Sequence, residues 1–284
     1  QEKIIDPFIA GYAAGETPNP CVNCNTRVKF DSLLRKARML GCEYVATGHY
    51  VIREGNALLR GDRNKDQTYF LWGTPKEAIP HMLFPVGHME KPQVRRIAEE
   101  FGLPTAKKPE SQNICFVQGD IREFLAGHIT ATPGPLVDLE TGKQIGEHAG
   151  AQFYTVGQKK GLGLWQTHLE RYVVRVNVAT NEVFVGPRAA CEWGGLEARE
   201  VNLLVEPDEL PEQIEVQVRY RTKPVPARIE EMTPGRMTIR LKEPQFAVTP
   251  GQSAAFYSGD RLLGGGFIAR PMWNGLEHSE LALA

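Results

Sequence analysis

Two cysteines, Cys24 and Cys115, lie in sequence settings that could present a thiol for chemistry. Cys24 ends the run Thr-Pro-Asn-Pro-Cys-Val-Asn-Cys in residues 17–24, and Cys115 lies in Glu-Ser-Gln-Asn-Ile-Cys-Phe, residues 110–116. Each proline fixes its own φ and restricts the residue before it, so such a loop holds a thiol in one direction at low entropic cost. Cysteine is the most nucleophilic side chain near neutral pH and readily carries a persulfide. The pair therefore predicts sulfur or disulfide chemistry.

Cys21 and Cys24 also form a C-x-x-C pair, a pattern shared by zinc sites, redox motifs and iron–sulfur ligands. A structural zinc site needs four ligands, and the chain has no second C-x-x-C and no H-x-x-x-H. A thioredoxin-like motif lies between a strand and a helix, which the proline-rich approach fits poorly. Together with Cys115, the pair could ligate three irons of a [4Fe–4S] cluster with one open site. Cys42 and Cys191 are expected to be inert.

Three further groups of polar residues are candidates for ligand contacts. Gly48 and His49 end a predicted strand, the usual place for a ligand-facing loop in an α/β sheet, although a structural histidine is an equal alternative. The glycine-rich loop 157–163 carries Lys159 and Lys160 but lacks the Walker spacing, so it indicates either a polyanion contact or an idle surface loop. The run 65–68 follows other charged residues, and a solvated charge run is its default interpretation.

The third part of the chain is locally basic. Tyr220 lies among four basic side chains and could stack on a base. Positive charge beside an aromatic ring is typical of nucleic-acid contacts, although no single residue decides the matter. The basic residues are Arg219, Arg221, Lys223 and Arg228.

The elements that must position these groups fall into three segments, and the first, residues 1–120, has an α/β pattern. Helices are predicted before Gly41 and between Pro92 and Gly102, with a short buried strand over 44–49. Helix, strand and helix with short connectors predict part of a parallel, nucleotide-binding type of sheet. Burial is expected for Phe30, Leu33, Leu34, Ala37 and Leu40 in the first helix and for Val94, Ile97, Ala98 and Phe101 in the second.

The remaining segments, 121–195 and 196–284, are predicted to be β structure. The central one closes with a hairpin over 172–185 that turns at 179–181. The last contains alternating strands that predict a small β-barrel, with Arg219 and Tyr220 on opposite faces of one strand. The predicted fold is thus α/β plus β: a partial parallel-sheet domain, a small central domain and a C-terminal barrel. The barrel strands are expected at 215–220, 237–241, 253–257 and 262–268.

Composition narrows the class of protein. The 284 residues suffice for two or three domains, and 42% hydrophobic with 24% charged residues is ordinary for a globular chain. No run of about 18 apolar residues and no secretory start is present, so no membrane partner is expected. A net charge of −1 argues against a uniformly basic polyanion binder but allows a local basic face. Five cysteines, an odd number, predict the reducing cytoplasm.

Several motifs occur together in one order and carry a resemblance. Residues 17–25 are followed by Val28-Lys29-Phe30, Ala-Thr-Gly-His-Tyr at 46–50, Lys-Asp-Gln-Thr-Tyr-Phe-Leu at 65–71 and Cys115. Tyr-Thr-Val-Gly-Gln-Lys-Lys-Gly-Leu-Gly at 154–163 and Pro-Gly-Gln at 250–252 complete the set. Over its whole length the chain resembles the tRNA-specific 2-thiouridylases.

The resemblance implies ATP-dependent transfer of sulfur to C2 of the wobble uridine in tRNAs for Lys, Glu and Gln, after adenylation of the C2 oxygen. It implies a nucleotide-binding domain of the adenine nucleotide alpha hydrolase type, ATP with Mg²⁺, tRNA, and a protein that donates persulfide sulfur. Cys24 matches the nucleophile and Cys115 the persulfide carrier, with a transient disulfide between them, and Gly48 matches the ATP site. The matched tRNA contacts are Asn19, Pro20, Cys21, His49, Lys65, Asp66, Gln67, Arg219, Tyr220 and Gln252, to which the basic loop adds Lys159 and Lys160.

One family motif is absent. Members begin with a strand and an S-G-G-x-D-S loop that holds the ATP phosphates, and this sequence contains no such loop. We therefore expect residues 1–120 to be the C-terminal part of the catalytic domain of a longer protein. Two alternatives are an iron–sulfur-dependent thiolase that uses Cys21, Cys24 and Cys115, and a non-catalytic tRNA-binding protein.

Overall fold

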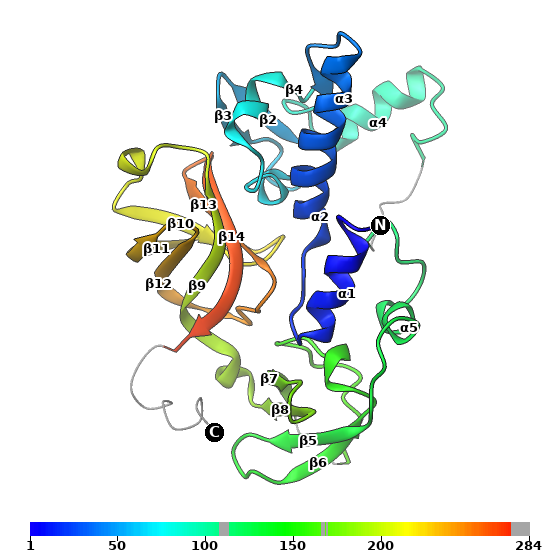
Figure 1. The fold of residues 1–284 in the computed structure, drawn as a ribbon, viewed down its shortest axis with the longest axis vertical. Helices are drawn as coiled ribbons and strands as arrows, with labels where there is room; N and C mark the ends of the chain where they lie inside the picture. Colours follow the sequence, from blue (N-terminus) through cyan, green and yellow to red (C-terminus); the bar gives the residue numbers. More distant parts are fainter. Residues whose placement is uncertain (108–113, 166–167, 169, 274–284) are drawn as a thin grey trace.

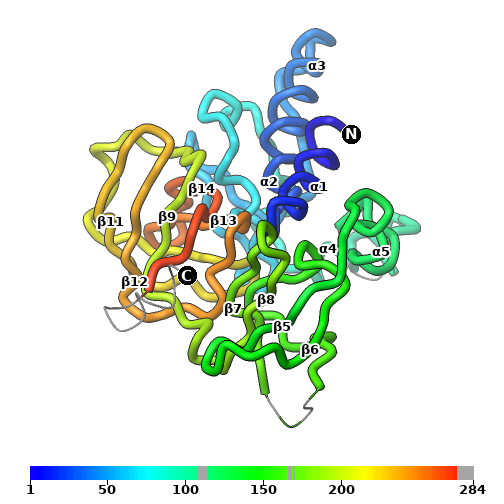
Figure 2. Tube along the Cα trace, turned by 60° about the horizontal axis from the view of Figure 1, so that its bottom comes forward, coloured from blue at the N-terminus to red at the C-terminus, as the bar shows by residue number. Residues whose placement is uncertain are grey.

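The computed structural model describes residues 1–107, 114–165, 168 and 170–273. A column of helices, a closed barrel and a smaller central sheet make up the structure (Figure 1). Figure 2 shows the barrel on the left of the helical column and the central sheet below the column. Among the described residues, no helix combines the length and the apolar character that crossing a membrane requires.

The helical column carries the first predicted helix. Phe30 and Leu34 are buried along it, and Gly41, at φ 78°, follows its end, which confirms the predicted helix and its stop. A short strand, β1 (Val45–Ala46), then pairs in parallel with β4 (Met82–Leu83), so the predicted strand is also confirmed but is only two residues long. The column consists of α1 (Ile5–Ala13), α2 (Pro20–Asn23), the π-helix η1 (Cys24–Leu33) and α3 (Leu34–Met39).

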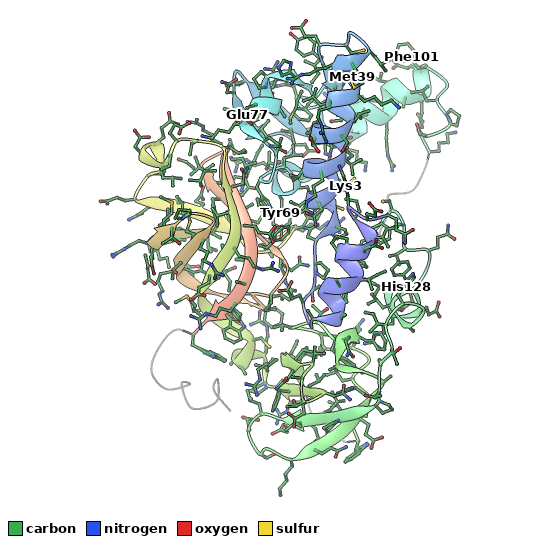
Figure 3. The ribbon with its side chains drawn as sticks, viewed as in Figure 1. Lys3, Met39, Tyr69, Glu77, Phe101 and His128 are labelled. Atoms are coloured by element: carbon green, nitrogen blue, oxygen red, sulfur yellow. The ribbon has the colours of Figure 1, made fainter. Side chains whose placement is uncertain are left out.

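The burial expected at the far end of this column was wrong. Leu40 is 73% exposed and Phe101 is 76% exposed, and the second helix, α4 (Lys91–Glu100), buries none of its residues. In Figure 3, Met39 and Phe101 both lie toward the top of the view, away from the central sheet at the bottom. The helices form where their periodicity predicts them, but the two-stranded sheet β1–β4 is too small to cover their apolar faces. Leu33 and Ile97 are exposed for the same reason.

The first segment also docks on the barrel. Trp72 packs on β14, where a Cβ at Gly265 would lie 2.5 Å from the tryptophan Cγ, so glycine is required there. Tyr69 lies between the barrel and the helical column (Figure 3), and its hydroxyl donates to Ser253 O at 3.0 Å. The docking elements are the hairpin β2 (Val51–Glu54) and β3 (Ala57–Arg60), with the 3₁₀ helices η2 (Thr68–Phe70) and η3 (Lys76–His81).

The central segment is a four-stranded mixed sheet in the order β6-β5-β8-β7. The predicted hairpin is confirmed, and Asn181 takes φ 55° in its turn. Leu136, Val173 and Val183 form the centre of its small core. The elements are α5 (Ile121–Ala126), β5 (Gly134–Asp138), β6 (Gln144–His148), η4 (Ala151–Phe153), β7 (Tyr172–Asn177), β8 (Glu182–Gly186) and η5 (Arg188–Cys191).

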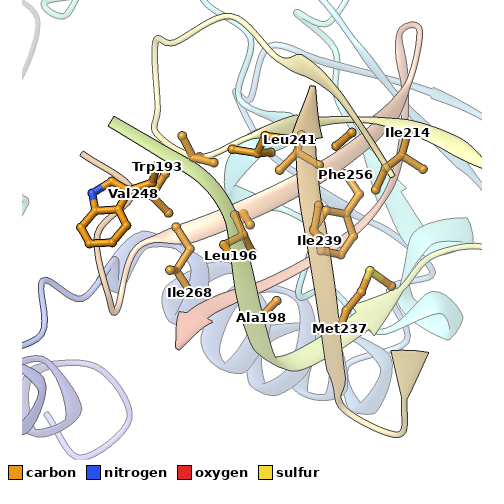
Figure 4. Packing of buried hydrophobic residues seen from close by; sticks show 14 of the residues in the cluster. Trp193, Leu196, Ala198, Ile214, Met237, Ile239, Leu241, Val248, Phe256 and Ile268 are labelled. Atoms are coloured by element: carbon orange, nitrogen blue, oxygen red, sulfur yellow. The ribbon is translucent and has the colours of Figure 1, made fainter. Parts of the chain in front are cut away.

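The last segment is the predicted barrel. Six antiparallel strands run in the order β13-β10-β11-β12-β9-β14, and pairing of β13 with β14 closes the sheet. Leu196, Ile239 and Phe256 lie in its interior (Figure 4), which places the alternating apolar residues on one face as expected. The elements are β9 (Glu192–Leu203), η6 (Pro207–Glu209), β10 (Gln213–Gln217), β11 (Val225–Thr233), β12 (Arg236–Phe246), β13 (Ser253–Ser258) and β14 (Arg261–Met272).

One strand is shorter than its pattern predicts. Strand β10 ends at Gln217, so Arg219 and Tyr220 lie in a turn and not on opposite faces of a strand. The chain reverses at Arg221, which has φ 71°. Tyr220 leaves the barrel to pack against Phe70, with ring centroids 4.6 Å apart, and this contact replaces the strand pairing.

Candidate functional site

Residues 16–24, here called the thiol loop, hold two cysteines on a rigid turn. Asn19 is 8% exposed and caps α2, because its Oδ1 accepts a hydrogen bond from Cys21 N at 3.3 Å. Pro20 is buried at the first helical position, where its fixed φ suits the helix. Cys21 is exposed on this first turn and Cys24 is half-buried one turn later. The predicted proline-stiffened presentation of the thiols is therefore present.

Cys115 lies close enough to Cys21 to act on its thiol, although the two are far apart in the sequence. Burial of the thiol, followed by the neighbouring Cys115 and Cys24, raises the pKa of Cys21, while Lys29 lowers it. A raised pKa keeps the Cys21 thiol protonated near neutral pH and makes it a poor nucleophile. All three cysteines are free of disulfides.

Aromatic packing fixes the position of Cys115. The neighbouring Phe116 packs edge-on against Phe8 of α1, with ring centroids 5.3 Å apart. Residues 110–113 of the cysteine's predicted motif lie outside the described residues. Over the part of the chain that is described, no group of three or more His, Cys, Asp or Glu side chains is arranged to hold a metal ion.

The other two cysteines have different surroundings. Cys42 is exposed just after Gly41, beyond α3. Cys191 is buried with its Sγ donating to Val173 O at 3.4 Å, and burial raises its pKa to about 11. A buried thiol that stays protonated suits the inert role expected for Cys191.

The π-helix η1 carries side chains that reach from the thiol loop to residues 47–49, here called the strand-end loop. Its wide turn begins at Cys24, and π-helical turns, which are rare, are frequently found at functional sites. Asn25 is buried and its amide donates to Phe70 O at 3.1 Å, which anchors the turn. Lys29 lies about one turn further on, with its Nζ 3.5 Å from His49 Nε2. A cation thus lies between the thiols and the strand-end loop.

The strand-end loop presents open space at Gly48 and a packed ring at His49. A Cβ at Gly48 would meet no atom within 4 Å. The His49 ring is 8% exposed, lies 6.2 Å from Phe30 by centroid, and has its Nδ1 2.8 Å from Thr47 Oγ1. Burial, and secondly Lys29, lower its pKa to about 4, so the imidazole is neutral at neutral pH. Its role as a tRNA contact stays a prediction.

The run 65–68 is folded into the protein. Asp66 accepts hydrogen bonds from both the backbone N–H and the hydroxyl of Thr68, lies 3.8 Å from Arg60 and is 11% exposed. Burial raises the pKa of its carboxyl. Gln67 Oε1 accepts from Tyr50 N at 3.0 Å. A fully solvated charge run is therefore the wrong interpretation for Asp66 and Gln67, while Lys65 is half-buried beside them.

The remaining predicted contacts lie on the barrel and the basic loop. Arg219 Nη2 donates to both Val156 O and Thr249 Oγ1 at 2.8 Å. Gln252 Nε2 donates to Thr17 O at 2.7 Å. Lys159 is exposed and pairs with Glu170 at 2.5 Å, and Lys160 is exposed beside it. Arg219 and Gln252 therefore bind other loops of the protein, whereas the two lysines face solvent.

Sequence reasoning did not find Glu16, Lys29 or Arg199 as parts of this site. Glu16 and Arg199 form an ion pair of 2.6 Å between the thiol loop and the barrel. Each is an isolated charge in its own segment, so no spacing marks it. Only the Val-Lys-Phe motif around Lys29 carried a signal, because it directly follows the cysteines.

Comparison with known proteins assigns a family to this arrangement. A family model described as a tRNA methyl transferase HUP domain matches residues 1–119. Models described as a tRNA methyl transferase PRC-barrel domain and an aminomethyltransferase beta-barrel domain match 122–187 and 193–268. A tRNA-specific 2-thiouridylase MnmA of Thermus thermophilus is 61% identical over 280 residues, which is 98% of this chain and 75% of that relative. The chain belongs to the tRNA-specific 2-thiouridylase family.

Other family members agree. The tRNA-specific 2-thiouridylase MnmA of Deinococcus radiodurans is 57% identical over 95% of this chain and 72% of its own length. That of a Synechococcus strain is 47% identical over 95% of the chain and 76% of the relative. The resemblance found in the sequence is confirmed, as is the fold of a nucleotide-binding type of domain with a C-terminal barrel. The domain boundaries at 120 and 195 and the roles of individual residues stay predictions.

Proposed function

We propose that this 2-thiouridylase family member transfers sulfur to C2 of the wobble uridine of tRNAs for Lys, Glu and Gln, using ATP. The observation that carries the proposal is that Cys115 lies within electrostatic reach of Cys21 on the thiol loop, while the strand end is open at Gly48. The names of the relatives support tRNA as the substrate and C2 of uridine as the acceptor. A reducing cytoplasm suits an enzyme whose thiols must return to the free state.

The first step makes the C2 oxygen a leaving group. The uracil O2 attacks the α-phosphorus of ATP and pyrophosphate leaves, so that the oxygen departs later as AMP. Gly48 would lie against the nucleotide, because a side chain there would occupy the open space. Mg²⁺ would accompany ATP and neutralise phosphate charge.

The second step moves the sulfur. A donor protein loads Cys115 with a persulfide, whose terminal sulfur attacks C2 while AMP leaves. The Cys24 thiolate then attacks Cys115 Sγ and breaks the sulfur–sulfur bond, which leaves sulfur on C2 and a Cys24–Cys115 disulfide. A dithiol reductant returns both cysteines to thiols. Asn19, Pro20 and Cys21 would line the target base.

The exposed lysines of the basic loop are proposed to contact the tRNA backbone. Replacing Lys159 and Lys160 together with alanine should weaken tRNA binding and flatten its salt dependence by about one unit of slope for each lost phosphate contact. The measurement is the tRNA dissociation constant at several salt concentrations. Glu170→Gln is the matched control, because it releases Lys159 from its ion pair and keeps the positive charge. An unchanged slope in the double variant would make this an idle surface loop.

The iron–sulfur alternative predicts a different result at Cys21. Under the persulfide mechanism Cys21→Ala should retain activity within about threefold, because the thiol is protonated and only lines the base pocket. Loss of a cluster ligand would instead abolish both activity and visible absorbance. Thiolated-nucleoside yield and absorbance, measured aerobically and anaerobically, separate the two cases. A colourless, inactive Cys21→Ala protein from a coloured parent would favour the cluster.

The proposal as a whole is tested by incubating the full-length protein with tRNA, ATP and a persulfide donor. Thiolated nucleoside, AMP and pyrophosphate should form together, and only when tRNA is present. Tight tRNA binding with no tRNA-dependent pyrophosphate release would instead support the non-catalytic tRNA-binding alternative.

A further inference from the structure

The barrel holds the thiol loop through its backbone. Thr17 N donates to Pro250 O at 2.9 Å, and Gln252 Nε2 donates to Thr17 O at 2.7 Å. Both backbone polar groups of one residue are thus bound by a single turn of the barrel. The approach is so close that a Cβ at Gly251, which has φ 84°, would lie 2.9 Å from Glu16 Cβ. Glycine is the residue that allows this contact.

A second contact from the barrel lies one residue earlier. Arg199 of β9 pairs with Glu16 at 2.6 Å, and the two side chains are 33% and 27% exposed. An ion pair of this partial burial is screened less by solvent than a fully exposed one. Arg199 also lies over the Phe267 ring and contacts Glu200, so its guanidinium is fixed in direction.

The central segment reaches the same residue. Thr17 Oγ1 donates to Thr155 Oγ1 at 3.1 Å. Arg219 donates hydrogen bonds to Val156 O, next to Thr155, and to Thr249 Oγ1 of the barrel. The loop that contains Thr155 is therefore held against the barrel. Thr17 is therefore the point at which all three segments of the chain meet.

Movement at Thr17 must reach the thiols, because the intervening backbone is stiff. Pro18 and Pro20 fix two φ angles, and Asn19 between them caps α2, which carries Cys21 and runs directly into η1 at Cys24. We propose that Arg199 and Gln252 are positioning residues, which set the direction of the thiol loop from the barrel for the sulfur transfer proposed above. Through them, tRNA held against the barrel and the basic loop would orient the thiols that act on its uridine.

The test uses the reactivity of the thiols themselves. Gln252→Glu keeps the size of the side chain but loses the donor to Thr17 O. Arg199→Gln removes the positive charge that pairs with Glu16. Both variants should change the rate of Cys24 alkylation by iodoacetamide at least about threefold relative to Cys42 in the same molecule. Peptide mass spectrometry gives the ratio, and thermal unfolding shows that each variant is folded. Arg240→Gln, which removes a surface pair with Glu230, is the matched control and should leave the ratio unchanged.

Kinetics separate positioning from tRNA contact. A positioning role predicts that both variants lower kcat for thiolation about tenfold while the KM for tRNA changes less than twofold. Exchanging the charges, with Glu16→Arg and Arg199→Glu in one protein, should restore part of kcat. Raised KM with unchanged kcat would instead make Gln252 a tRNA contact, as the resemblance implies, and would overturn the proposal.

An unchanged ratio of Cys24 to Cys42 alkylation in both variants would also overturn it, whatever the activity. If the full-length parent protein forms no thiolated nucleoside, the proposed function fails. The alkylation ratio still decides whether the barrel positions the thiol loop.

Discussion

In the full-length protein, replacing Cys115 with serine is expected to abolish loading with sulfur from a persulfide donor, while tRNA-dependent release of pyrophosphate continues. A serine oxygen cannot form a persulfide, whereas the site for ATP and tRNA is left in place. Retained protein-bound ³⁵S after desalting should fall roughly a thousandfold.

Cys42→Ser is the control for that result, because Cys42 is also exposed but lies beyond α3. It should load as the parent does. Full loading of the Cys115→Ser protein would mean that another cysteine carries the persulfide.

Replacing Cys24 with serine is expected to leave sulfur loading intact and to block formation of the thiolated product. The variant should accept labelled sulfur on Cys115 but fail to release thiolated tRNA, because no thiol remains to attack Cys115 Sγ. Multiple-turnover yield should fall roughly a thousandfold, and labelled sulfur should remain linked to the protein. Nucleoside analysis after single-turnover and multiple-turnover reactions makes the measurement. Unimpaired multiple turnover would remove Cys24 from the mechanism.

The secondary structure of this chain was predictable where apolar periodicity and glycines that end helices act locally. The helix that buries Phe30 and stops at Gly41 follows from its own sequence, as does the hairpin that turns at Asn181. Burial was not predictable in the same way. The apolar face of α4 has the right spacing, but Phe101 stays exposed because burial depends on what lies opposite. Strand β10 ends early because Tyr220 gains an aromatic partner in another segment.

In the candidate site too, features set by local sequence were predictable and long-range contacts were not. The prolines around Asn19 predict a rigid presentation of Cys21 and Cys24, since their effect is local. The contact between Glu16 and Arg199 joins residues 183 positions apart and leaves no trace in either segment. Gly251 belongs to the Pro-Gly-Gln motif at 250–252, but the sequence does not show why glycine is needed there. The structure does, because the thiol loop approaches Gly251 too closely for a side chain.

The central claim, that Cys24 and Cys115 act together on one sulfur atom, is tested most directly by trapping their disulfide after one turnover. Protein loaded with persulfide is mixed with tRNA and ATP without reductant, alkylated, and mapped by non-reducing peptide mass spectrometry. A disulfide requires Cα atoms within ~7 Å, so its formation also shows that the two loops meet during the reaction. We expect one Cys24–Cys115 disulfide for each thiolated uridine formed. Thiolated uridine without that disulfide, or with a Cys21–Cys24 disulfide in its place, would contradict it.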